Sequence, residues 1–94
     1  MPTVRAKIRL VNTQGLHARP CHAIVSAALE FTSDLRVGCH GQTVNGKSIL
    51  ELMTLCAAFG DELEFEATGE DAQGLVDGLS EIVLSGFGEL GERG

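Results

Sequence analysis

The chain has 94 residues, a length that supports one hydrophobic core and therefore a single domain. Hydrophobic residues make up 44% of the chain and charged residues 21%, values typical of globular proteins, which excludes a disordered or collagen-like chain. The formal net charge of −6 argues against nucleic acid as a partner, because a phosphate backbone is bound by clustered Lys and Arg.

The sequence also argues against a membrane protein and against a disulfide-bonded protein. No apolar run approaches the roughly 18 residues that span a bilayer, and residues 1–10 alternate polar and apolar instead of forming the apolar block of a signal peptide. We therefore expect a cytoplasmic protein without membrane insertion. The cysteines are odd in number and form no C-x-x-C pair, so we expect reduced thiols at Cys21, Cys39 and Cys56.

The N-terminal part predicts a strand followed by a helix. Residues 3–11 alternate between polar and apolar side chains, which is typical of a half-buried strand. A polar loop follows at residues 12–15, and from residue 18 to residue 29 apolar residues recur at helical spacing. We therefore expect the first helix to begin directly after His17.

The middle of the chain predicts a hairpin and a second helix. Residues 35–45 form two short strand-like segments around the turn CHGQ. Ser48 and Glu51 then stand at capping-box spacing at the start of a strongly apolar run, residues 49–59. Gly60 stands where it would stop this helix.

The C-terminal part predicts a fourth strand and a third helix. Residues 62–67 alternate again, and their three glutamates suit the outward face of a neighbouring antiparallel strand that carries Arg5, Lys7 and Arg9. We expect Asp71 to cap a helix whose apolar stripe is Ala72, Leu75, Val76, Leu79 and Val83. Residues 86–94 are too rich in glycine and polar residues to predict structure. The order β-α-β-β-α-β-α indicates an α+β domain with its helices on one face of a sheet.

The segment GLHARP, residues 15–20, carries the most distinctive chemistry. His17 would stand beside the unpaired N–H groups and the positive end of the first helix, where an attached phosphoryl group is stabilised. Arg19 would add a movable cation, and Pro20 fits a first helical turn because it has no N–H to leave unpaired. Histidine is a suitable nucleophile near neutral pH, whereas lysine is mostly protonated.

Two motifs in this sequence resemble those of one known family. GLHARP is similar to the segment around the phosphorylated histidine of the HPr phosphocarrier proteins of the bacterial phosphotransferase system, and VNGKSILELM, residues 44–53, is similar to their regulatory serine segment. The resemblance implies an open-faced β-sandwich, a four-stranded antiparallel sheet covered on one face by three helices. The HPr-like domain would span residues 1–88, with residues 89–94 as a flexible tail.

The resemblance also implies a function. His17 would take a phosphoryl group from enzyme I and pass it to an enzyme IIA domain, while Arg19 helps to hold the phosphate. The chain would be a monomeric phosphocarrier for sugar transport, not an enzyme, and would need no cofactor. Ser48 would be the target of a regulatory serine kinase or phosphorylase, besides its expected role as a helix cap.

The second helix is apolar nearly all round, so part of it must be exposed. An exposed apolar strip near Ser48 is best explained as a docking patch. The resemblance implies the same surface, which we expect to comprise Lys47, Ile49, Leu50, Leu52 and Met53.

Two alternatives remain open. One is a regulatory, nitrogen-type phosphotransfer module without sugar uptake. The other is a metal or thiol-redox module, because Cys21 and His22 stand where small residues are expected, and a first helical turn lowers a thiol pKa. We expect instead that Cys21 is a small buried apolar residue. Zinc is disfavoured because the adjacent residues Cys39 and His40 should point to opposite faces of a strand, so that at most one joins a site.

Overall fold

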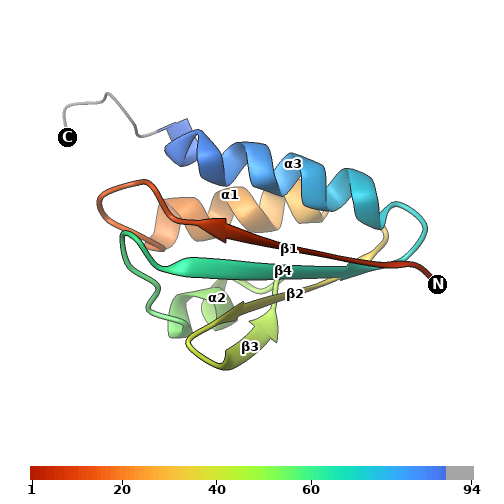
Figure 1. Ribbon diagram of the computed structural model, residues 1–94, viewed down its shortest axis with the longest axis horizontal. Helices are drawn as coiled ribbons and strands as arrows, with labels where there is room; N and C mark the ends of the chain where they lie inside the picture. The colour runs from red at the N-terminus through yellow and green to blue at the C-terminus, as the bar shows by residue number, and fades with distance from the viewer. Residues whose placement is uncertain (89–94) are drawn as a thin grey trace.

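A computed structural model describes residues 1–88, which form one antiparallel sheet and the helices that cover it (Figure 1). The strands are β1 (Thr3–Arg9), β2 (Asp34–Cys39), β3 (Gln42–Asn45) and β4 (Glu62–Thr68). The helices are α1 (Ala18–Ala28), α2 (Ile49–Thr54) and α3 (Ala72–Leu84), followed by a 3-10 turn, η1 (Gly86–Gly88). The predicted order of elements and the α+β open-faced sandwich are confirmed.

The sheet has the strand order β1-β4-β2-β3, so the first and fourth strands are neighbours. The predicted charge match between them is confirmed, because their register pairs Arg5 with Glu66, Lys7 with Glu64 and Arg9 with Glu62. Arg5 and Glu66 form an ion pair of 2.6 Å. Arg9 instead donates a 2.7 Å hydrogen bond to the carbonyl of Gly60, in the loop that leads into β4.

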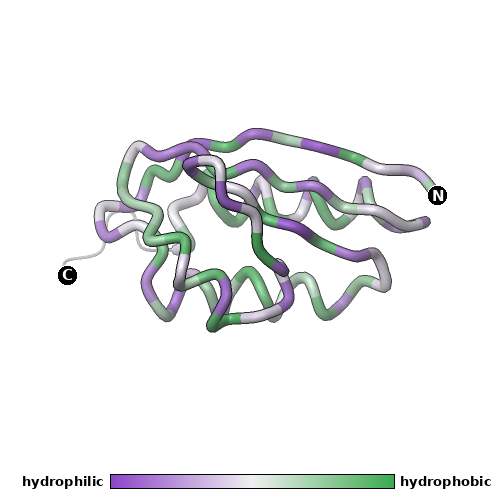
Figure 2. The backbone as a smooth tube through the Cα atoms, turned by 90° about the horizontal axis from the view of Figure 1, so that it is seen from below, coloured by the Kyte–Doolittle hydropathy of each residue, from purple (hydrophilic) through white to green (hydrophobic). Residues whose placement is uncertain are grey.

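The core lies between the sheet and the helices. Hydrophobic and hydrophilic positions alternate along the strands (Figure 2), and Leu63, Phe65 and Ala67 of β4 are fully buried. The buried residues of α3 are those of the predicted stripe: Ala72, Leu75, Val76, Leu79 and Val83. Among residues 1–88 the structure has no helix of the length and apolar character needed to cross a membrane.

The second helix is shorter than predicted, because α2 ends at Thr54 rather than continuing to residue 59. Cys56 has a φ of 51°, a left-handed conformation that an α-helix cannot contain. Leu55 and Ala57, on either side of it, are both buried. The apolar character of this stretch therefore comes from a loop that packs into the core, and periodicity alone could not separate that loop from a helix.

Asp71 stands at the N-cap position of α3, as predicted, but its side chain makes no capping hydrogen bond. Its carboxylate accepts hydrogen bonds from the hydroxyl and N–H of Ser33 and from the N–H of Thr32, in the loop before β2. These bonds lower the pKa of Asp71 to about 2, with the Ser33 hydroxyl making the largest contribution. Asp71 thus ties α3 to a distant loop.

The sequence pattern gives no structural prediction for residues 86–94, although the domain is expected to extend to residue 88. Residues 86–88 form the turn η1, in which Phe87 has a φ of 59° and packs, half-buried, against the core. Burial of the Phe87 ring attaches this segment to the core, although a glycine stands on either side of it. The predicted flexible tail, residues 89–94, lies outside the described part of the chain.

Candidate functional site

The loop before His17 is shaped by a buried asparagine. The side-chain amide of Asn12 donates a 2.8 Å hydrogen bond to the carbonyl of Gly15, and the N–H of Gly15 donates to the carbonyl of Asn12 at 3.2 Å. Asn12 is fully buried. The sequence predicted only a polar loop here. An asparagine three residues before a glycine is the local signal for this turn.

This loop is attached to the loop that follows α2. Leu16 donates a backbone hydrogen bond of 2.9 Å to the carbonyl of Ala57. Gly15 has a φ of 66°, and a Cβ placed on it would lie 2.4 Å from that same carbonyl oxygen. Glycine is therefore required at this position by both conformation and close approach.

His17 occupies the N-cap position of α1, as predicted, and its backbone is extended. The first intrahelical hydrogen bond runs from the N–H of Cys21 to the carbonyl of His17. The amides of Ala18 and Arg19 come before this bond, so neither has an acceptor within the helix. Pro20, at the next position, has no N–H. The half-buried imidazole thus stands at the positive end of an 11-residue helix, a position that favours an anion.

Arg19 is exposed and lines a surface hollow together with Ala18, His22, Ala23 and Phe87. Ala18 and Arg19 belong to the first turn of α1, so part of this hollow lies at the helix end that carries His17. Sequence reasoning missed Phe87. The sequence feature that could have indicated Phe87 is that it is the one aromatic residue in a segment made mainly of glycine and polar residues.

Cys21 fits the expected small buried residue rather than the alternative of a reactive thiol. Its side chain is fully buried, and burial raises its pKa to about 11 rather than lowering it. Position 21 lies on the buried side of α1. His22 is exposed, with a ring nitrogen 3.5 Å from the hydroxyl of Ser26. Cys21 is a small buried core residue.

Ser48 caps α2 as predicted, since its hydroxyl accepts a 3.2 Å hydrogen bond from the N–H of Glu51. In a full capping box the carboxylate of Glu51 would accept from the N–H of Ser48, and this bond is replaced here. The carboxylate of Glu51 accepts from the N–H of Asn45, at 2.9 Å, while the N–H of Ser48 donates to the carbonyl of that same asparagine. Ser48 is half-buried, and its hydroxyl lies at the junction of β3 and α2.

The expected docking patch is only partly exposed. Leu50 is 78% exposed and Met53 is 41% exposed, and Ile49 is half-buried against the core. Leu52 is fully buried, so including it in the patch was wrong: it is the one residue of α2 with a fully buried side chain. Lys47 is half-buried, and its ammonium donates a 2.9 Å hydrogen bond to the carbonyl of Phe31.

The expectation that Cys39 and His40 point apart was also wrong. Cys39 is the last residue of β2, but His40 has a φ of 56° and so leaves the alternation of the strand. Their ligand atoms lie within 4.8 Å of each other and of a carboxylate oxygen of Asp61.

The chain is similar to proteins of one family. The family model described as "PTS HPr component phosphorylation site" matches residues 4–85. The phosphocarrier protein HPr of Neisseria meningitidis serogroup A is 36% identical, and the match covers 92% of this chain and 97% of that protein. A crystal structure of the phosphocarrier protein HPr of Bacillus anthracis superposes with a TM-score of 0.83 at 30% identity, covering 88% of this chain and 99% of that one.

A longer kind of relative is also similar. The multiphosphoryl transfer protein of Haemophilus influenzae is 35% identical over 92% of this chain. The chain spans only 18% of that protein, and 22% of its counterpart from Vibrio cholerae.

Proposed function

The chain belongs to the HPr phosphocarrier family of the phosphotransferase system, and from this premise we propose that His17 accepts a phosphoryl group from the phosphohistidine of enzyme I and passes it to a histidine of an enzyme IIA domain. The observation that carries the proposal is the position of His17: a half-buried imidazole at the N-cap of α1, beside the amides of Ala18 and Arg19.

In this transfer the main task of the protein is to position the imidazole of His17 against the phosphoryl group. A ring nitrogen of His17 bonds to phosphorus while the bond from phosphorus to the imidazole of enzyme I breaks. The ring of His17 gives up one proton and the leaving imidazole takes up one, so protons balance. Transfer to enzyme IIA repeats this exchange with His17 as the leaving group, and no small molecule is turned over.

The charge of the phosphohistidine is met from two sources. The amides at the start of α1 and the helix dipole stabilise the phosphoryl oxygens without any movement. Arg19, which is exposed and lies two residues after His17, supplies a full positive charge on a flexible side chain. A mobile cation suits a carrier, because the phosphoryl group must be held and then released.

The docking surface that we propose is the exposed part of α2: Leu50 and Met53, with Ile49 and Lys47 at its edge. Leu50 and Met53 expose two large apolar side chains, 78% and 41%, on the same short helix, and such a local apolar patch suits a surface that a partner covers. The helix leads directly into the loop that contacts Gly15 and Leu16, so a partner on α2 approaches the segment that carries His17.

Ser48 is the site at which we propose regulation. A phosphoryl group on its hydroxyl would place negative charge at the start of α2, beside the docking residues, and would repel acidic groups of a partner. A test compares Ser48→Asp with Ser48→Asn. Both side chains retain a capping oxygen, so an increase in the KM of enzyme I for the aspartate variant alone would report charge rather than loss of the cap.

The test of the carrier function uses phosphoenolpyruvate, Mg²⁺ and enzyme I, with intact mass spectrometry as the readout. The wild-type chain is expected to gain one acid-labile phosphate, and His17→Ala to gain none. His22→Ala and His40→Ala are the matched controls, because both residues are exposed and neither is the proposed acceptor. Equal labelling of His17→Ala and wild type would exclude His17 as the acceptor.

The same adduct, added to purified enzyme IIA domains of the sugar and nitrogen branches, distinguishes the two kinds of phosphotransfer module. Loss of the phosphate to a sugar-specific domain supports sugar transport. Loss only to a nitrogen-type domain supports the regulatory alternative.

A further inference from the structure

Three potential metal ligands meet at one end of the sheet, and none of them has a role in the proposed phosphoryl transfer. Cys39 ends β2, His40 follows it in the β2–β3 turn, and Asp61 directly precedes β4. The Sγ of Cys39, a ring nitrogen of His40 and a carboxylate oxygen of Asp61 all lie within 4.8 Å of one another. The geometry points to a binding site for one divalent transition-metal ion of the Zn²⁺ class, with these three side chains as ligands and water in the fourth position.

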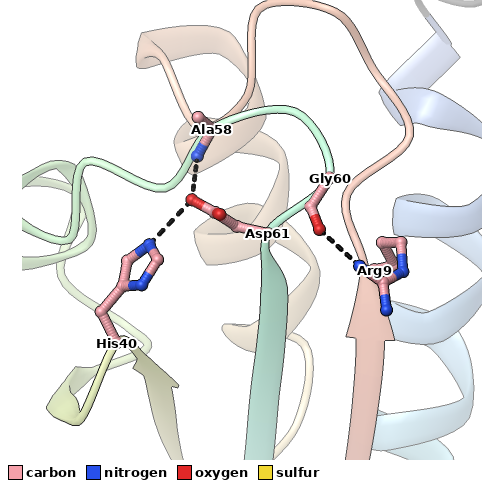
Figure 3. Close-up of polar contacts among 5 residues, drawn as sticks. All are labelled: Arg9, His40, Ala58, Gly60 and Asp61. Carbon is pink, nitrogen blue, oxygen red and sulfur yellow. Dashed lines mark hydrogen bonds and ion pairs between the residues drawn. The ribbon is translucent and has the colours of Figure 1, made fainter.

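The distances require only side-chain adjustment. Bonds of about 2.0–2.3 Å from Zn²⁺ to N, O and S place tetrahedral ligand atoms roughly 3.5 Å apart. The Nε2 of His40 and the Oδ2 of Asp61 are now 2.9 Å apart in a hydrogen-bonded pair (Figure 3), so these two separate slightly while the sulfur approaches.

The backbone holds Asp61 ready for this role. Its Oδ2 accepts a 2.8 Å hydrogen bond from the N–H of Ala58 (Figure 3), and its own N–H donates to the carbonyl of that same residue at 2.9 Å. On the other side, its carbonyl accepts from the N–H of Leu10 at 2.8 Å. Groups that orient a ligand in this way are typical of metal sites.

The left-handed backbone at His40 brings the imidazole to the same side as Cys39, which the regular alternation of a strand would prevent. Such a conformation is uncommon for residues other than glycine. Gly41 follows with a φ of 79° and completes the turn.

The charges and donor atoms select the kind of ion. A thiolate, a neutral imidazole and a carboxylate together balance a dication, and sulfur with nitrogen favours Zn²⁺ or Co²⁺ over Mg²⁺ or Ca²⁺, which prefer oxygen ligands. The thiol proton of Cys39 passes to solvent as the metal–sulfur bond forms.

The side chains of His40 and Asp61 are 61% and 25% exposed, so an ion can reach these two ligands from the surface. Cys39 and His40 line a hollow whose wall includes Glu62, Glu64 and Lys7, so its ionised residues sum to a negative charge. That charge attracts a hydrated cation.

The experiment is titration of the purified full chain with Co²⁺, followed by absorption spectroscopy. One equivalent is expected to produce the visible bands of tetrahedral cobalt and the near-ultraviolet band of a cobalt–thiolate bond, both removed by Zn²⁺. Cys39→Ser, His40→Gln and Asp61→Asn are each expected to weaken Co²⁺ binding by more than the roughly 10- to 100-fold typical of losing a group that only orients a ligand.

Controls separate this site from other thiols and histidines. Cys56→Ser removes an exposed thiol outside the cluster, and His22→Gln removes an exposed imidazole; both are expected to keep the bands. His17→Ala is expected to keep them too, so the result is independent of phosphotransfer. Cys39 is buried, so Cys39→Ser can unfold the protein. In that case the His40 and Asp61 variants test whether the cluster binds Co²⁺. Absence of the thiolate band, or its survival in His40→Gln and Asp61→Asn, would overturn the proposal.

Discussion

The backbone N–H of Leu16 lies 2.9 Å from the carbonyl oxygen of Ala57, and this hydrogen bond joins the loop before His17 to the loop after α2. The same carbonyl oxygen is the atom that a Cβ at position 15 would meet at 2.4 Å. The two loops therefore fit only when residue 15 has no side chain. His17 directly follows Leu16, so this contact helps to position it at the start of α1.

Gly15→Ala is expected to destabilise the fold by more than the left-handed backbone alone explains. The conformational cost for alanine is about 1–2 kcal/mol, and the contact with Ala57 adds to it. Gly41→Ala is the matched control, because Gly41 has a φ of 79° but a Cβ at this position would meet no atom within 4 Å. Urea unfolding measures both variants. Equal losses would contradict a close approach of the loops.

Leu52→Ala and Leu50→Ala separate the core from the docking patch. Leu52 is fully buried, so its truncation is expected to cost about 2–5 kcal/mol of unfolding free energy. Leu50 is 78% exposed, so Leu50→Ala should change stability by less than about 0.5 kcal/mol while raising the KM of enzyme I. Denaturation and steady-state phosphorylation assays measure the two effects. A normal KM for Leu50→Ala would remove this residue from the patch.

Much of the fold could be predicted because its patterns are local. Alternation located β1 and β4, and 3.6-residue spacing located every buried residue of α3. The end of α2 could not be predicted, since the buried loop residues Leu55 and Ala57 are as apolar as a helix face. Only the left-handed Cys56 distinguishes the two, and cysteine gives no signal of that conformation.

The candidate site could be predicted in part. The position of His17 at the start of α1 follows from a proline and a helical pattern, both readable in the chain. The meeting of Cys39, His40 and Asp61 could not be predicted, because it depends on one backbone angle in a turn and on strand order. Neither property is encoded by periodicity.

Asp71 is expected to make stability depend on pH in the acid range. Hydrogen bonds from Ser33 and Thr32 lower its pKa from 3.8 to about 2, so the folded state binds the proton less well than the unfolded state. Its contribution is complete above pH 3.8 and is lost as the pH falls through about 2. Asp71→Asn should therefore be less stable than wild type at neutral pH, with a flatter dependence on pH in this interval.

The measurement is urea unfolding of wild type and Asp71→Asn at a series of pH values. Asp77→Asn removes a carboxylate on the exposed side of α3 and controls for the change in net charge. Parallel pH profiles for wild type and Asp71→Asn would contradict this role for the carboxylate.

The three thiols are expected to react at very different rates. Cys56 is exposed, while Cys39 is buried and Cys21 is fully buried with a pKa of about 11. A thiol reagent added to the native protein should label one residue rapidly, and Cys56→Ser should lose that phase. Rapid labelling of Cys21 would instead revive a redox function for this helix.

The central claim is that one of three histidines carries the phosphoryl group, and the most direct measurement locates that group. The chain is phosphorylated with phosphoenolpyruvate and enzyme I, digested at alkaline pH to preserve phosphohistidine, and sequenced by mass spectrometry. Phosphate is expected on His17 and none on His22 or His40. Phosphate on either of the other histidines, with His17 unmodified, would contradict the claim.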